Sequence, residues 1–179
     1  IERENAEHEL VDMLRRQMID GIIMGCHSLE VDLYDNVNKP IVAFDRIINN
    51  KIPIIRSDHE KGGRLAAQAM LKAGCKYPLQ ITGIKNSSMS AYLHHSAFKD
   101  ELSRNGIEVI NYEMEWNKFS MDYFCQVAKE IFERYPEIDG IYGTDMIICA
   151  CYAEACKHNL KVPQDIKLIA YDGTLITNC

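Results

Sequence analysis

Four aspartates and the only tryptophan of this 179-residue sequence are the side chains best suited to bind a polar small molecule. Asp45, Asp58, Asp145 and Asp172 each follow a short apolar segment within three residues, and Trp116 follows another such segment. Ionised aspartate accepts two or more hydrogen bonds, which suits the hydroxyls of a polyol. An indole face suits the apolar face of a sugar ring. The set therefore indicates a small-molecule site in which a few polar groups converge.

A local structural role is the alternative for each of these aspartates. Asp58 and Asp145 precede segments with helical spacing, and aspartate is a favoured N-cap. Asp45 and Asp172 precede no clear helix and would then be turn residues. These alternatives stay open for each residue alone, whereas the set as a whole favours a ligand site.

The sequence lacks the motifs that carry catalysis or cofactor binding. It contains no G-x-S-x-G, no H-E-x-x-H and no G-x-x-x-x-G-K-[ST]. His94 and His95 are neighbours, and neighbours on a helix point about 100° apart, which disfavours joint metal binding. We therefore expect no enzyme activity, no catalytic residue, no cofactor and no bound metal. A doubly wound enzyme using the aspartates as an acid–base pair or magnesium site is the weaker alternative.

Seven cysteines, an odd number, occur without any C-x-x-C spacing. This pattern argues against a disulfide framework, a zinc ribbon and a redox motif. Free cysteines are typical of a reducing compartment, so we predict a cytoplasmic protein. Cys149, Cys151 and Cys156 are then expected to pack as small apolar side chains.

Composition and charge restrict the class of protein further. The sequence is 47% hydrophobic and 26% charged, which is typical of one average-sized globular domain or two small ones. Its purely apolar runs are too short to span a bilayer, so no membrane partner is expected. The net charge of −6 and the scattered basic residues make this stretch alone a poor binder of nucleic acid.

Helical and extended patterns alternate along the chain and must position the polar residues. Strands are predicted at residues 21–25, 40–44, 52–55, 79–83, 107–112, 138–142 and 166–171. Helices are predicted at about residues 6–18, 60–73, 90–104, 124–132 and 148–155. This alternation predicts an α/β fold with a mainly parallel sheet. Such sheets bind ligands beyond the carboxyl ends of their strands, where the aspartates lie.

Two helices have an apolar face that can be read from residue spacing. In the first helix the face is expected to consist of Ala6, Leu10, Leu14 and Met18. In the second it is expected to consist of Leu65, Ala69, Met70 and Ala73.

Five phrases of the sequence, in their order and spacing, resemble the lactose-repressor (LacI/GalR) family of transcriptional regulators. They are IDGIIM at residues 19–24, KPIVAFDR at 39–46, RSD at 56–58 with GG at 62–63 and AA at 66–67, TDM at 144–146, and VPQDI at 162–166 with YDG at 171–173. Each phrase alone is weak, whereas five in order are specific. The VPQDI phrase favours the repressors over their periplasmic sugar-binding relatives.

The resemblance implies a periplasmic-binding-protein type I-like α/β fold, with two doubly wound parallel-sheet subdomains around a cleft. Residues 1–57 would form an incomplete N-terminal effector-binding subdomain. Residues 58–171 would form the C-terminal subdomain, and residues 172–179 would cross back to the first. The helix-turn-helix head that the family carries at its N-terminus is absent from this sequence.

For function, the resemblance implies a domain that binds a sugar effector in the cleft and forms a homodimer. Effector binding would rearrange the subdomains and so control operator DNA binding by the missing head. A periplasmic-type sugar-binding receptor of the same fold is the alternative. The YDGT ending at residues 171–174 resembles sucrose-operon repressors, so sucrose or another di- or monosaccharide is the expected effector.

The resemblance also implies a set of effector-binding residues. They are Asp45, Arg56, Ser90, His94, Trp116, Asp145 and Asp172. The largest departure is His94, because the family has an arginine there in the pattern R-x-x-G-[FY]. Arginine offers five donors and histidine one or two, so we hypothesise that Arg56 supplies the missing guanidinium.

Overall fold

The computed structural model describes residues 6–25, 32–83, 90–115 and 118–177. These residues form two compact units. The first unit contains residues 6–59 together with residues 90–93, and the second contains residues 60–83 and 94–177.

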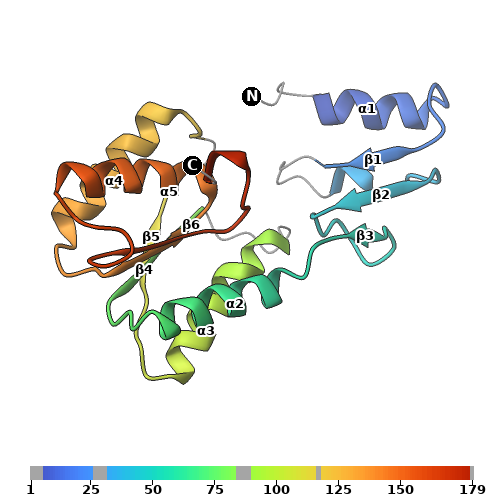
Figure 1. Cartoon of the computed structure of the whole chain (residues 1–179). Coiled ribbons are helices and arrows are strands. Elements are labelled where there is room, and N and C mark those ends of the chain that lie inside the picture. Colours follow the sequence, from blue (N-terminus) through green and yellow to red (C-terminus); the bar gives the residue numbers. More distant parts are fainter. Residues whose placement is uncertain (1–5, 26–31, 84–89, 116–117, 178–179) are drawn as a thin grey trace. The chain divides into compact units, whose positions relative to one another are not determined.

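The first unit is a small parallel sheet with a helix along it (Figure 1). Its elements are α1 (Ala6–Arg15), β1 (Ile22–Met24), the 3₁₀ turn η1 (Asp32–Tyr34), β2 (Ile41–Phe44) and β3 (Ile54–Ile55). The strand order is β1-β2-β3, and both strand pairs are parallel. The three predicted strands are therefore present, each somewhat shorter than its apolar segment.

One face of this sheet is buried and the other is exposed. Residues from β1, β2 and α1 form the core on the buried face: Val11, Leu14, Ile22, Met24, Ile41 and Ala43. On the other face Ile23 is 86% exposed, Phe44 54% and Ile55 62%. This follows from the period of two along each strand.

The predicted apolar face of the first helix is wrong in part. Leu14 is fully buried as expected, but its buried partner is Val11, while Leu10 is 43% exposed. The helix ends at Arg15, so Met18 lies beyond it. Residues three apart lie on the same face of a helix, as do residues four apart. In α1 the buried pair, Val11 and Leu14, is three residues apart.

The second unit is a four-stranded parallel sheet covered by helices on both faces. Its elements are α2 (His59–Lys72), β4 (Pro78–Thr82), α3 (Leu93–Arg104), β5 (Ile110–Glu113), α4 (Met121–Arg134), β6 (Gly140–Gly143), α5 (Asp145–Lys157), β7 (Lys167–Ala170) and the 3₁₀ turn η3 (Leu175–Thr177). The 3₁₀ turn η2 (Ser90–Tyr92), which leads into α3, belongs to the first unit. Figure 1 shows α4 and α5 on one side of the sheet and α2 and α3 on the other. The α/β alternation predicted from the sequence is confirmed.

Alternate residues along the strands contact the two helical layers. Leu79 and Ile81 of β4 pack into the core built with α4 and α5. Tyr142 of β6 packs into the core built with α2 and α3. The spatial order of the strands is β5-β4-β6-β7. The chain therefore runs from β4 outward to β5, and from β6 outward to β7 in the opposite direction along the sheet. The carboxyl ends of β4 and β6 therefore flank the switch point at which such sheets bind ligands.

The predicted face of the second helix is also wrong in part. Met70 is fully buried as expected, but Leu65 is 55% exposed, and Ala66 and Ala67 are buried instead. Gly63 explains the orientation, because a Cβ there would lie 2.1 Å from the carbonyl oxygen of His94. The helix thus turns its smallest residues toward α3, which lets the two backbones approach closely.

No helix among the described residues is long and apolar enough to cross a membrane.

Candidate functional site

Six of the seven predicted site residues lie in the described part of the chain, and Trp116 lies outside it. Asp45, Arg56 and Ser90 belong to the first unit. His94, Asp145 and Asp172 belong to the second. Within each unit the strands deliver them to the carboxyl edge of the sheet: Asp45 directly follows β2, Arg56 follows β3, and Asp172 comes two residues after β7.

In the first unit Asp45 and Ser90 are in contact. The Ser90 hydroxyl donates to the backbone carbonyl of Asp45 at 2.8 Å and lies 3.4 Å from its Oδ1. Ser90 is buried, with 1% of its surface exposed. Asp45 has a φ of 54°, a left-handed conformation that aspartate tolerates better than most residues. Ser90 therefore holds both the backbone and the side chain of Asp45.

His59 completes this cluster, although no motif of the sequence predicted a role for it. Its Nε2 lies 2.6 Å from Oδ1 of Asp45, and the imidazole is almost completely buried. His59 is the first residue of α2 and directly follows the RSD phrase. This position next to a family motif is the feature of the sequence that could have indicated a role for His59. The Asp45 carboxylate therefore contacts both His59, at the start of α2, and Ser90 of η2.

Arg56 differs from Asp45 in being exposed. Within the part of the chain that the structure describes, its side chain makes no hydrogen bond. Arg46, by contrast, is 2% exposed, and its guanidinium contacts Oε1 of Glu7 at 2.5 Å. The Tyr34 hydroxyl donates to the same Glu7 oxygen. Arg46 thus connects β2 to α1, whereas Arg56 is exposed to solvent.

His94 is buried in an aromatic cluster of the second unit. Its ring is stacked on Tyr171 with centroids 3.7 Å apart, and its Nδ1 lies 2.7 Å from the Tyr142 hydroxyl. Only 4% of its surface is exposed. Gly62 of α2 faces Tyr171 so closely that a Cβ would approach the ring to 2.8 Å. A histidine fits among these rings, and its hydrogen bond to Tyr142 fixes the ring orientation.

His95 lies beside His94, with ring centroids 3.9 Å apart. Burial lowers the pKa of His95 to about 4, so it is neutral at physiological pH. Burial likewise raises the pKa of Tyr142 well above its usual value, and Tyr171 and Asp172 raise it further. Among the described residues, no group of three or more His, Cys, Asp or Glu side chains is arranged to hold a metal ion.

Asp145 does not cap α5 as the alternative interpretation proposed. Thr144 is the N-cap residue, without a side-chain cap hydrogen bond, and Asp145 is the first residue of the helix. Its Oδ1 accepts from the backbone N–H groups of Asp172 and Gly173, both at 3.1 Å. Its Oδ2 accepts from the N–H and the hydroxyl of Thr174, both at 2.5 Å. We call residues 172–174 with the Asp145 carboxylate the Asp145 clamp.

The clamp leaves Asp172 exposed while Asp145 is buried. Burial alone would raise the pKa of Asp145, but the hydrogen bonds from residues 172–174 hold it below its usual range. Asp145 is therefore an ionised, saturated acceptor. Asp172 is the carboxylate of this pair that faces solvent.

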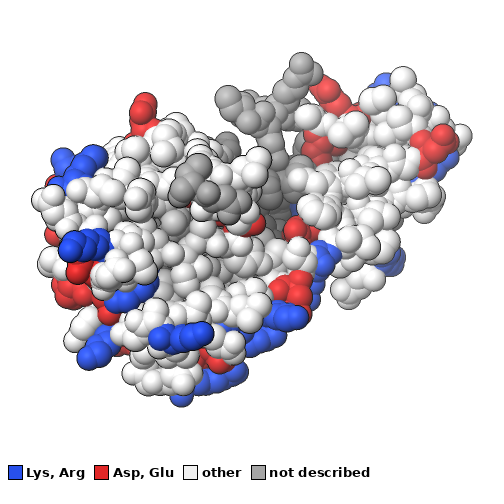
Figure 2. Space-filling model, viewed as in Figure 1, with Lys and Arg blue, Asp and Glu red and all other residues white. Residues whose placement is uncertain are grey.

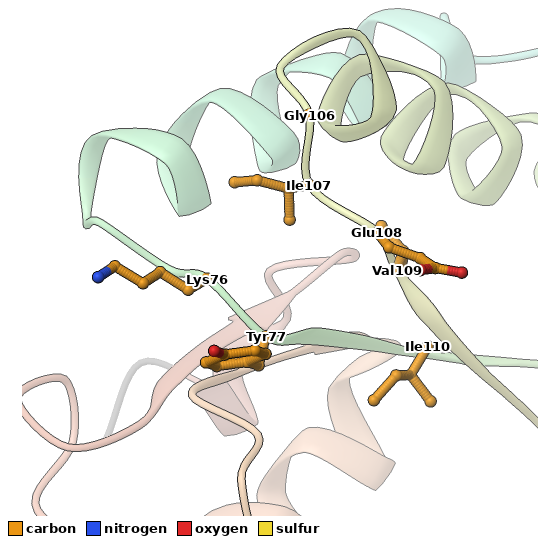
Figure 3. Close-up of a pocket in the computed structure, with 7 residues that line it drawn as sticks. All are labelled: Lys76, Tyr77, Gly106, Ile107, Glu108, Val109 and Ile110. Atoms are coloured by element: carbon orange, nitrogen blue, oxygen red, sulfur yellow. The ribbon is translucent and has the colours of Figure 1, made fainter.

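A cavity of about 530 Å³ lies elsewhere in the second unit (Figure 3). It is lined by Lys76, Tyr77 and residues 106–110, which precede β4 and β5. It therefore opens at the amino ends of the strands, opposite the edge that carries Asp145 and Asp172. None of the predicted site residues lines it.

Figure 2 shows acidic side chains lying among the basic ones on the second unit. No continuous basic stripe runs across the face shown there.

Residues 1–174 match the family described as periplasmic binding proteins and sugar binding domain of LacI family. The chain is 34% identical to the sucrose operon repressor of Streptococcus mutans serotype c, over 94% of this chain and 51% of that protein. It is 28% identical to the ribose operon repressor of Halalkalibacterium halodurans, over 96% of this chain and 51% of that protein. The chain thus spans about half the length of the curated relatives it matches.

Solved structures show the same fold. A LacI-type regulator from Alkaliphilus metalliredigens, complexed with D-xylulofuranose, superimposes with a TM-score of 0.78 at 26% identity, over 96% of this chain and 64% of that one. The CelR–cellobiose complex superimposes with a TM-score of 0.80 at 21% identity, over 97% and 55%. The predicted periplasmic-binding-protein type I-like fold is confirmed. By sequence and by fold, this chain belongs to the family of periplasmic binding proteins and sugar-binding domains of LacI-type regulators.

Proposed function

We propose that this chain is the sugar effector-binding domain of a LacI-type transcriptional repressor. The observation that carries the proposal is the exposed Asp172 carboxylate, held by the Asp145 clamp at the carboxyl edge of a doubly wound parallel sheet. The match to operon repressors along nearly the whole chain favours this function over that of a periplasmic receptor. The proposed role is binding and not catalysis.

The proposed effector is sucrose or another di- or monosaccharide. The relatives include sucrose and ribose operon repressors, and the solved neighbours hold D-xylulofuranose and cellobiose. Asp45 and Asp172 accept hydrogen bonds from sugar hydroxyls, and Arg56 donates them in place of the arginine usual at position 94. Ser90, His94, Trp116 and Asp145 complete the proposed site, by contact or by support.

The proposed mechanism is allosteric. Residues 1–57 and 58–171 act as two subdomains, and a helix-turn-helix head of the kind that the family carries binds operator DNA. A sugar that binds one arrangement of the subdomains better than the other shifts the equilibrium between them. Couplings of this kind are typically about 1–3 kcal/mol. The protein acts in the cytoplasm, where the operator is.

The proposed assembly is a homodimer, and α5 offers a surface for it. Its core side packs Ile147, Ile148 and Cys151, while its exposed side carries one charged residue, Lys157 in the last turn. The rest of that side consists of Met146, Cys149, Tyr152, Ala153 and Cys156, next to Leu175 of η3, which is 86% exposed. A largely uncharged exposed helix face is a candidate for contact with another chain. A second copy suits this surface because the chain carries a net charge of −6, whereas this face exposes no acidic side chain that would repel its own copy.

A thermal-shift screen tests the proposed function. The protein is heated with sucrose, fructose, ribose, xylulose and cellobiose, with mannitol as a polyol control. A ligand at about 100 times its Kd stabilises the native state by about 2.7 kcal/mol, which raises Tm by several degrees. We expect a clear shift with at least one sugar and none with mannitol. A flat result across all sugars contradicts the proposal.

Control of DNA binding is tested with the longer protein that includes the DNA-binding head. We expect the sugar that shifts Tm to change operator affinity by about 5- to 150-fold. An operator titration that is indifferent to every bound sugar contradicts the repressor mechanism while leaving sugar binding intact.

A further inference from the structure

We propose that the cavity at the amino ends of β4 and β5 is a second small-molecule site, which takes a flat aromatic ring carrying one carboxylate. The cavity lies wholly within the second unit, and none of the predicted effector-binding residues lines it. The proposal is therefore independent of sugar binding, and either can fail without the other.

The cavity has the size and the lining of a small-molecule site. Its volume of about 530 Å³ falls within the range of roughly 300–1,000 Å³ that is usual for such sites. Figure 3 shows Lys76 and Glu108 at opposite ends of the lining, with the Tyr77 ring and aliphatic side chains between them. Those aliphatic side chains are Ile107, Val109 and Ile110. An apolar centre with charged ends suits an amphipathic ligand.

Tyr77 offers an aromatic surface on which a flat ring can stack. The residue is 56% exposed, although Pro78, the first residue of β4, is buried next to it. The phenol makes no hydrogen bond to any residue that the structure describes. Aromatic pairs gain energy beyond the area that they bury, so an aromatic ring is favoured here over a saturated ring of the same size.

Lys76 supplies a positive charge at the edge of the cavity. Its side chain is exposed, and within the described ranges no carboxylate forms an ion pair with it. A carboxylate on the ligand can therefore accept a charge-assisted hydrogen bond from the ammonium group. The ring and the carboxylate of the ligand thus each have a matching group in the lining.

The surroundings favour one negative charge on the ligand over two. Lys76 is the only cation in the lining, and Glu108 is already an anion there. The helices α2 and α3 end at Lys72 and Arg104, just before the two segments that line the cavity. Because a helix C-terminus carries a partial negative charge, a second ligand charge would be repelled without a cation to offset it. A monocarboxylate is therefore preferred to a phosphate.

Both walls of the cavity are held by hydrogen bonds. The Asp139 carboxylate accepts from the backbone N–H groups of Lys76 and Tyr77. It also accepts from the Cys75 thiol, which keeps its proton because burial raises the pKa of that thiol to about 12. On the other wall, the N–H groups of residues 105–107 donate to carbonyls in the last turn of α3. Walls fixed in this way lower the entropy that ligand binding costs.

Titration with benzoate, followed residue by residue by NMR of the backbone amides, tests the site and its location. We expect a Kd on the order of 1 mM, which is ordinary for a ligand of about nine non-hydrogen atoms. The largest changes should fall on residues 76–77 and 106–110, and the amides of residues 172–174 should not move. No saturable change at the lining, or changes centred elsewhere, would overturn the proposal.

Three relatives of benzoate test the class of ligand. Benzyl alcohol keeps the ring and lacks the charge, and phenyl phosphate carries nearly two charges at about pH 8. Both should bind about tenfold more weakly than benzoate. Cyclohexanecarboxylate keeps the charge and lacks the flat ring, and it should bind about threefold more weakly. A relative that binds as tightly as benzoate overturns the proposed class.

Variants of exposed residues, which are expected to retain the fold, test the two contacts. Lys76→Gln should weaken benzoate binding about tenfold and leave benzyl alcohol within about twofold of wild type. Tyr77→Leu should weaken the binding of both. Lys72→Gln is the matched control, since it removes the same charge at the end of α2 without changing the lining, and it should change neither affinity.

Equal losses of benzoate affinity in Lys76→Gln and Lys72→Gln would mean that benzoate responds to overall charge and not to a contact with Lys76. That result, or a Tyr77→Leu protein that binds benzoate as wild type does, overturns the site.

Discussion

At the scale of single residues, the side chains at the strand ends are held by partners far along the sequence. The Asp45 carboxylate is bonded by His59, and Ser90 lies against it. Asp145 is bonded by residues 27 to 29 positions away. Each carboxylate is therefore set in place before any ligand arrives, which lowers the entropy that binding costs.

His59→Ala removes the buried imidazole that lies 2.6 Å from the Asp45 carboxylate. Because the imidazole is buried and hydrogen-bonded to a carboxylate, the variant should lose about 1–3 kcal/mol of unfolding free energy. Urea denaturation measures the loss. His158→Ala is the control, since 45% of the His158 side chain is exposed, and it should cost far less. Equal losses in the two variants would contradict a specific His59–Asp45 interaction.

His95 should make stability depend on pH. Its pKa is about 4 in the folded protein and about 6.5 when unfolded, so the unfolded chain binds more protons between those values. Stability contributed by neutral His95 is complete above about pH 6.5 and is lost as pH falls toward 4. We expect a loss of about 2 kcal/mol between pH 7 and pH 5.

Denaturation of wild type, His95→Leu and His158→Gln across that pH range checks this expectation. His95→Leu should flatten the dependence, whereas His158→Gln should retain it. A pH dependence as steep in His95→Leu as in wild type would show that other groups cause it.

The sequence predicted which residue types gather at the strand ends, but not which of them face a ligand. Asp145 and Asp172 looked alike because both follow a strand. What distinguishes them is the direction of three backbone N–H groups, which depends on the left-handed turn at Gly173. That turn type cannot be derived from side-chain pattern alone. His59 was missed for a related reason, since its contact joins segments 14 residues apart.

At the scale of helices and strands, periodicity predicted the order of the elements well and their faces less well. All seven strands and the five main helices occur in the predicted order. The errors concern α1 and α2, where small or β-branched residues are buried in place of leucines. Leucine is more apolar than alanine, yet Leu65 is exposed, because the close approach of Gly63 to α3 determines which side of α2 faces the core.

Gly63→Ala tests this packing. The added Cβ would meet the His94 backbone at 2.1 Å, so α2 and α3 must separate, at a cost of about 1–3 kcal/mol. Gly83→Ala is the control, since a Cβ there has no atom within 4 Å. Thermal unfolding compares the two. A Gly63→Ala protein as stable as the Gly83→Ala protein would contradict the close approach of the helices.

At the scale of the whole molecule, the chain combines a polar strand edge with a largely uncharged outer face of α5. The first suits a sugar, and the second suits another copy of the chain. The fold class, the family and the two sheets could all be predicted from alternating patterns and five short phrases. The spacing of apolar residues along the sequence determines which segments form helices and strands. A binding surface depends instead on which exposed side chains come together in the folded chain.

Ala153→Glu tests the dimer surface. A carboxylate on the largely uncharged outer face of α5 would meet its own copy across the two-fold interface of the proposed dimer, and repulsion should dissociate that dimer. Sedimentation velocity should show a fall from dimer to monomer mass. Gln68→Glu, which adds the same charge on the exposed side of α2, should leave the dimer intact. A dimer unaffected by Ala153→Glu would place the interface elsewhere.

Calorimetric titration of sucrose and ribose into the wild-type protein and into Asp172→Asn tests whether this domain binds a sugar through Asp172. We expect one sugar per chain for wild type, and an affinity about 10- to 100-fold weaker for the variant. Heat of binding that is absent from wild type for both sugars, or equal affinity in wild type and variant, would contradict sugar binding through Asp172.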